Sequence, residues 1–150
     1  MSMAAIRAQI ATILDAVSGV ENVYQRKRWA VDEMQFKTLF KTSSNKITGW
    51  MVSRISTEEI DETGSSNVAR HIFRIIGIYG LQDSADTETT FQALIESIRA
   101  AFQAAFGLNG TARYTSPIQV NVVEERVFGS ILCHYAQLTI TADETVAWTT

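Results

Sequence analysis

Apolar residues recur at spacings of three and four in the first 20 residues of the chain, which predicts an amphipathic helix. Ser2 stands where a side chain would cap the start of this helix, and Gly19 stands where a left-handed residue would end it. One predicted apolar stripe contains Ile6, Ile10, Ile13, Leu14 and Val17.

A second helix is predicted over residues 86–106, where the helical period is clearest. Ser84 or Asp86 would cap its start, and Gly107 would end it. Its stripe contains Phe91, Leu94, Ile95, Ile98, Phe102, Ala105 and Phe106. A shorter helix is predicted over residues 32–42, because Phe36, Leu39 and Phe40 fall on one side.

Five segments are expected to be strands: residues 20–29, 46–59, 67–80, 118–127 and 130–142. The second and third would form a long hairpin through the polar segment 61–66, which is rich in turn formers. Helices and strands are mixed without regular alternation. The prediction is therefore a single α+β domain over residues 1–150, with a mostly antiparallel (mixed) sheet of four to five strands, two main helices on one face and a long protruding hairpin.

The last strand is apolar on both sides, because Ile131, Cys133 and Tyr135 alternate with Leu132, Ala136, Leu138 and Ile140. Two helices would cover only one face of the sheet. Either loops and the short helix cover the other face, or a second copy of the chain does.

The chain has 150 residues, with 13 Lys+Arg, 16 Asp+Glu, one Cys and a net charge of -3. A lone cysteine suits a reducing compartment and excludes an internal disulfide. No apolar run reaches the roughly 18 residues that a membrane-spanning helix needs, and the first residues lack the pattern of a signal peptide. The small net charge does not favour a dedicated nucleic-acid binder.

Charge is separated along the chain. Residues 22–54 hold seven basic and two acidic residues, and the acidic run follows at once. The basic residues Arg26, Lys27 and Arg28 lie between Tyr24 and Trp29, and the acidic residues are Glu58, Glu59, Asp61 and Glu62. Three interpretations remain open: solvated surface, head-to-tail contact between subunits, and a nucleic-acid stacking platform.

No set of residues predicts catalysis, a metal or a cofactor. Cys133 and His134 are adjacent in a strand and would point to opposite faces, and His71 is far away in sequence. Ser130 lacks a nucleophile-elbow pattern, and residues 107–110 follow a helix instead of preceding one, unlike a phosphate loop. The sequence predicts a protein that is not an enzyme and holds no cofactor.

The order of segments resembles the tail terminator (tail completion) proteins of long-tailed bacteriophages, the family of the lambda minor tail protein U. The resemblance rests on MAAIRAQIATILDAV, KITGWMVSRISTEE, NVARHIFRIIGIYG, TETTFQALIESIRAAFQAAF and IQVNVVEERVFGSILCHYAQLTI. The similarity covers most of the chain and lies in the order of the segments, their lengths and their hydrophobic patterns. It identifies no functional residue.

The resemblance implies a structural virion protein at the head-proximal end of the tail, assembled in the host cytoplasm. Such a protein would form a hexameric ring that caps the tail tube, stops its polymerisation and provides a docking surface for the head. Its partners would be the tail tube protein, connector or neck proteins, and genomic DNA that passes the lumen without specific binding; no membrane is involved. The basic residues 26–28 of one subunit would meet the acidic residues 58–62 of the next.

Three other functions remain open. The first is a head–tail connector or neck ring protein, which is structural but occupies another station. The second is a small ligand- or nucleic-acid-binding α+β module that uses residues 24–29. The third is an enzyme, which the absence of a nucleophile–base or carboxylate pair makes the least favoured.

Overall fold

The computed structural model describes residues 2–42 and 45–147, which fold into one α+β unit. Within these residues the α-helices are α1 (Met3–Asp15), α2 (Glu33–Phe40) and α3 (Thr87–Ala104). Two short 3-10 turns, η1 (Asp83–Ala85) and η2 (Phe106–Leu108), lie at the two ends of α3. The predicted fold class is confirmed.

The sheet has six strands within the described residues, in the order β1-β2-β3-β6-β4, with β5 also paired to β6. The strands are β1 (Val23–Tyr24), β2 (Thr48–Thr63), β3 (Ser66–Gly80), β4 (Tyr114–Thr115), β5 (Gln119–Phe128) and β6 (Ile131–Ala147). Only the β1–β2 pair is parallel. The count exceeds the predicted four to five because β1 and β4 have two residues each, too few to leave a periodic pattern.

The helix ends follow the sequence closely. Ser2 caps α1 by accepting a hydrogen bond of 3.1 Å from the Ala5 N–H, and Asp86 caps α3 through the Thr89 N–H. The helix α1 ends earlier than predicted, because Ala16 is its C-cap and Gly19, at φ +94°, shapes the turn beyond it. Gly107, at φ +70°, stops the helical region after α3, a conformation that glycine adopts without strain.

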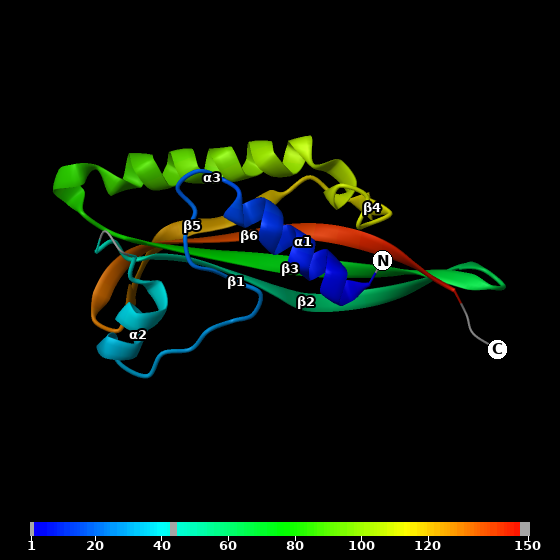
Figure 1. The fold of residues 1–150 in the computed structure, drawn as a ribbon, viewed down its shortest axis with the longest axis horizontal. Coiled ribbons are helices and arrows are strands. Elements are labelled where there is room, and N and C mark those ends of the chain that lie inside the picture. Colours follow the sequence, from blue (N-terminus) through cyan, green and yellow to red (C-terminus); the bar gives the residue numbers. More distant parts are fainter. Residues whose placement is uncertain (1, 43–44, 148–150) are drawn as a thin grey trace.

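The helices α1 and α3 cover one face of the sheet, which we call the helical face, and α2 lies on the opposite, second face (Figure 1). The main core lies under α1 and α3. In it, Trp50 of β2 is fully buried, and its ring stacks on Phe91 of α3 with centroids 6.0 Å apart. Gly77 of β3 makes this possible, because a Cβ there would lie 2.3 Å from the indole ring.

The second face is covered by the chain itself where it is apolar. Phe36 and Phe40 of α2 pack with Met51, Ile78 and Tyr135 in a separate buried cluster that also contains Cys133. Beyond α2 the second face carries Arg74, Gln137, Thr139 and Thr141 on the central strands, with the half-buried Ile72 opposite Thr141. Of the two alternatives for covering this face, the structure shows the first: the short helix α2 covers Cys133 and Tyr135, while Leu138 and Ile140 lie in the main core on the helical face.

The hairpin is longer and better supported than predicted. The strand β2 continues to Thr63, a two-residue turn at Gly64-Ser65 joins it to β3, and β6 remains paired with β3 as far as Ala147 opposite Ser66. We call this three-stranded extension, residues 56–63, 66–72 and 141–147, the arm. It projects past the helices at one end of the molecule (Figure 1).

Chemical labelling of Cys133 tests whether α2 shields the buried cluster on the second face. Burial raises the pKa of the Cys133 thiol to about 11, because the apolar surroundings disfavour the thiolate. At pH 8 we expect a disulfide reagent to label Cys133 in the native protein more than 100-fold more slowly than in urea, since the thiolate is the nucleophile and the side chain is covered. Rapid stoichiometric labelling of the native chain, followed by absorbance, would show that α2 does not shield this face.

Candidate subunit interface

The predicted basic residues lie in an irregular segment between β1 and α2, not in a strand. Only residues 23 and 24 pair with β2, so the prediction of a strand over residues 20–29 is wrong beyond them, and Tyr24, Arg26 and Arg28 do not share a strand face. We call residues 25–31 the basic strap. Arg26 and Lys27 are exposed, and neither has an ion-pair partner among the described residues.

Tyr24 serves packing and is not free to stack on a base. Its hydroxyl donates a hydrogen bond of 2.6 Å to the Leu39 carbonyl, and its ring meets the Phe40 ring edge-on at 6.0 Å. The Arg28 guanidinium lies 4.7 Å from the Tyr24 ring centroid. Trp29 is the aromatic side chain of the strap that remains open, with 81% of its surface exposed.

The predicted acidic residues lie on the arm. Glu59 accepts a hydrogen bond of 2.9 Å from Asn67, and Glu62 forms an ion pair with Arg113. Because Arg113 donates hydrogen bonds to it, the pKa of the Glu62 carboxyl lies below its ordinary value. Glu58 and Asp61 are exposed and form no hydrogen bond or ion pair with the described part of the chain. The arm therefore presents carboxylates that its own cations do not neutralise.

The arm is held together by charged contacts between its strands. Arg70 of β3 donates hydrogen bonds of 2.9 and 3.0 Å to the two carboxylate oxygens of Asp143 on β6. His71, which is buried, lies 2.8 Å from both Thr57 Oγ1 and Glu144 Oε1. These contacts cross all three strands, so the arm is a braced structure and not a loose loop.

Substitution of Asp143 tests whether these contacts stabilise the arm. Asp143 is only 5% exposed, and replacing it by alanine leaves Arg70 without its bidentate partner. We expect D143A to lower the free energy of unfolding by about 2 kcal/mol, as for hydrogen bonds to charged groups. Urea denaturation would measure this, with E96A as control, since Glu96 forms an exposed ion pair on α3. Equal, near-zero effects would show that the pair does not brace the arm.

The predicted basic and acidic residues do not meet within one chain. Tyr24 pairs beside Met51, whereas Asp61 lies ten residues further along β2. At about 3.3 Å per strand residue this corresponds to roughly 33 Å. The strap and the arm thus occupy opposite ends of the sheet (Figure 1). Any contact between them has to join two copies of the chain.

The structure adds residues to the basic end that sequence patterns did not indicate. A cavity of about 390 Å³ lies between the strap and the second face of the sheet. Arg74 of β3 and Arg126 of β5 line it together with Lys27 and Arg28, and we call it the basic pocket. Apolar side chains that line it include Phe36, Met51, Ile76, Ile78 and Phe128. Alternation in β3 placed Arg74 on the second face, but only the fold brings β5 and the strap to it.

Exposed apolar side chains gather in two other places. Trp29, Val31 and Met34 surround the start of α2, and each is more than three-quarters exposed. Val123, Val127 and Leu132 lie together on the helical-face side of the β5–β6 hairpin, where Val127 pairs with Leu132. The strand β5 pairs only with β6 among the described residues, so its other edge has no strand beside it.

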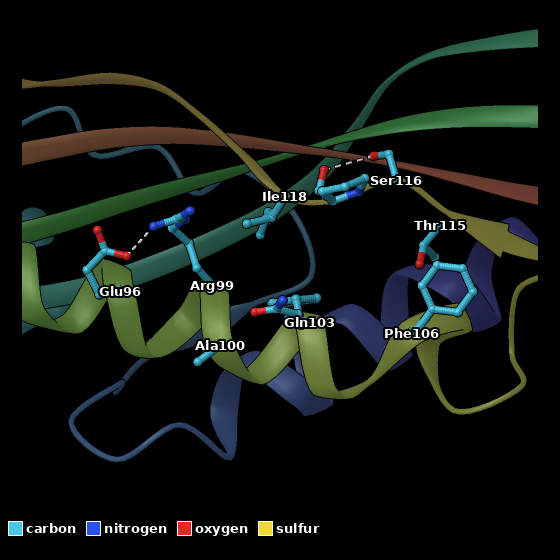
Figure 2. A pocket seen from close by; sticks show the side chains of 10 residues that line it. Glu96, Arg99, Ala100, Gln103, Phe106, Thr115, Ser116 and Ile118 are labelled. Carbon is cyan, nitrogen blue, oxygen red and sulfur yellow. Dashed lines mark hydrogen bonds and ion pairs between the residues drawn. The ribbon is translucent and has the colours of Figure 1, made fainter.

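A second cavity, of about 370 Å³, lies between α3 and the segment that joins β4 to β5 (Figure 2). Four of its polar side chains, those of Glu96, Arg99, Thr115 and Ser116, already have partners within the chain. Arg99 pairs with Glu96, Thr115 accepts a hydrogen bond from the Gly107 N–H, and Ser116 accepts one from the Thr141 N–H. This cavity therefore presents no arrangement of nucleophile and base.

No family model matches the chain, and none of the curated proteins is similar to it. Within residues 2–42 and 45–147, no three His, Cys, Asp or Glu side chains gather in a way that could hold a metal ion. None of the helices in this part of the chain combines the length and apolarity needed to cross a membrane. The fold and its surfaces define an α+β domain with an acidic arm at one end and a basic pocket at the other.

Proposed function

We propose that this chain is a non-enzymatic structural protein of a long-tailed bacteriophage. Copies of it form a ring that caps the head-proximal end of the tail tube, stops tube polymerisation and provides the docking surface for the head. Its partners are further copies of itself, the tail tube protein and the neck or connector proteins. DNA passes through the lumen without specific binding.

The observation that carries this proposal is the placement of unlike surfaces at opposite ends of one domain. A closed ring needs heterologous contacts, in which one patch of a subunit meets a different patch of the next. The acidic arm and the basic pocket are such a pair, because Asp61 lies eight residues, roughly 26 Å, beyond Ser53, the β2 partner of the pocket residue Arg74. Exposed apolar side chains lie near α2 and on β5. Their burial would stabilise the contact between subunits, and the opposite charges would set its orientation.

The subunit contact is expected to weaken when the arm changes charge. Exposed ion pairs contribute about 0–1 kcal/mol each, so E58K/E59K should raise the dissociation constant for assembly about tenfold, which corresponds to 1.4 kcal/mol. The measurement is the oligomer mass over a concentration series. The double variant D15K/E21K, which changes the same charge away from the arm, is the control. An unchanged dissociation constant for E58K/E59K would contradict the contact.

The capping function is tested by tube growth. Tail tube protein of the same phage should stop extending when the purified chain is added, and electron micrographs should show one extra ring at one end of each tube. Tubes of unchanged length without an end ring would contradict a tail terminator. Rings that bind only the isolated connector would assign the chain to the neck, the alternative structural station.

A second candidate, a small-ligand-binding module, is favoured by the basic pocket alone. Its cationic rim over an apolar floor suits a small molecule with an anionic group. A chain that stays monomeric and binds such molecules would support this function over the ring.

A further inference from the structure

The basic pocket holds more positive charge than its own surroundings neutralise. Within the described residues, Glu124 is the carboxylate that pairs with a pocket cation, and it pairs with Arg126. Lys27, Arg28 and Arg74 have no ion-pair partner in this part of the chain. Several like charges around one cavity repel one another, so an anion bound there gains from all of them.

Arg74 gives the strongest indication that the basic pocket binds a ligand. It lies in the central strand β3 on the second face, opposite Ser53 and Thr139. Its Nε atom is buried and has no hydrogen-bond partner in the described residues. A buried donor without a partner destabilises the folded chain, and a bound acceptor would remove that cost.

The pocket walls orient its cations. The Arg126 guanidinium lies 3.9 Å from the Tyr135 ring centroid, and the Arg28 guanidinium is held over Tyr24. Stacking on aromatic rings fixes a guanidinium plane without using its hydrogen-bond donors. Below them, Met51 and Ile76 give the pocket an apolar floor. The matching ligand therefore has an apolar group flanked by carboxylates.

The arm presents this combination. Ile60 of β2 is only partly buried and stands within the run Glu58-Glu59-Ile60-Asp61-Glu62. Glu58 and Ile60 point to the same side of the strand, about 7 Å apart along it. Arg70 and Arg113 form ion pairs with Asp143 and Glu62, and Arg70 also lies directly opposite Glu58 in the β2–β3 pair and attracts it. Glu59 and Asp61 point to the other side of the strand, so this run carries carboxylates on both of its sides.

We infer that the basic pocket of one copy receives the arm of a second copy. Ile60 then lies on the apolar floor with Glu58 beside it at Arg74, and Glu59 and Asp61, on the other side of the strand, face Arg28 and Lys27 of the strap. This inference rests on the proposed ring and names the partner of its basic end. Because the arm and the pocket are two different surfaces of the same sheet, the contact repeats head to tail.

The test uses two full-length variants that each lose one half of the contact. The pocket variant is R74E, and the arm variant is E58Q/I60T/D61N, in which threonine preserves the strand and no new charge appears. In native mass spectrometry we expect each variant alone at the monomer mass of 16.7 kDa. An equimolar mixture should give a dimer of one copy of each, at twice that mass and no larger, because only one intact contact remains.

Controls separate the possible failures. R99E reverses an exposed charge on α3 and should keep the wild-type mass, while circular dichroism checks that each variant folds. If R74E does not fold, K27E on the exposed strap replaces it. Variants that keep the wild-type mass, or a mixture that stays monomeric, would overturn the inference while leaving the ring. A wild-type chain that never assembles would overturn the proposed ring itself.

One further outcome would assign the pocket to a different partner. If R74E lowers the affinity for single-stranded DNA at least tenfold and leaves the oligomer mass unchanged, the pocket binds nucleic acid and the inference is overturned. If the inference holds, R74E changes the oligomer mass and has no such effect on DNA.

Discussion

Replacing Trp50 by alanine should lower the free energy of unfolding by about 3–5 kcal/mol, the cost typical of deleting a large buried aromatic side chain. The indole is fully buried between the sheet and α3, where it stacks on Phe91. Gly77 approaches the ring so closely that even a Cβ would overlap it. The closely packed residues around Trp50 should move little when the side chain is shortened to alanine, so a cavity should remain.

Chemical denaturation of W50A measures this cost, and W29A is the matched control. Trp29 is 81% exposed on the basic strap, so its removal should change stability by no more than about 0.5 kcal/mol. A similar effect of the two substitutions would contradict the position of the core beneath α1 and α3.

Replacing Phe40 by alanine should cost about 3 kcal/mol and also uncover the second face of the sheet. Phe40 is 2% exposed and touches the rings of Phe36 and Tyr24. A Cβ on Gly49 would lie 2.1 Å from its ring, so the sheet is shaped to receive it. With this anchor lost, α2 should detach more readily and expose the apolar cluster below.

Two measurements on F40A report these effects separately. Urea denaturation gives the loss of stability, and binding of a hydrophobic dye to the native state reports the uncovered face. F106A is the control, because Phe106 is 67% exposed at the end of α3. A stable F40A that binds no more dye than F106A would show that α2 is not what covers this face.

The sequence predicted the long elements well, because each buries one regular stripe or alternates along a strand. The stripe from Phe91 to Phe102 faces the core as expected, and Ser2 and Asp86 cap their helices. Elements shorter than one period could not be found this way. The strands β1 and β4 have two residues each and exist only because longer neighbours pair with them.

The sequence did not show which part of the protein covers the second face of the sheet. Cys133 and Tyr135 were visible as apolar positions, but the choice between α2 and a second copy depended on where α2 packs. The stripe Phe36, Leu39, Phe40 indicated the helix and not its target.

The candidate interface was predicted in part. Charge separation between residues 26–28 and 58–62 is visible in the sequence, and the fold places the two groups at opposite ends of the sheet. Arg74 and Arg126 were missed, because they come from β3 and β5 and join the strap only in three dimensions. An unpaired arginine on an otherwise apolar strand, as in HIFRIIGIY, was the one available signal.

An exposed apolar sheet face is not what would hold the proposed ring together. The ring depends on contact between unlike ends of the domain, since α2 covers the second face and the arm and pocket carry opposite unneutralised charge. Apolar side chains at Trp29, Met34 and Val127 supply further surface for such contacts. A contact between two unlike surfaces repeats from copy to copy and closes into a ring when the rotation between copies allows it.

The mass and shape of the wild-type particle test this account most directly. Native mass spectrometry with negative-stain microscopy should show a closed ring of a fixed number of 16.7 kDa chains, six if the proposed tail terminator function is right. A single 16.7 kDa species at every concentration, with no ring in the micrographs, would contradict it.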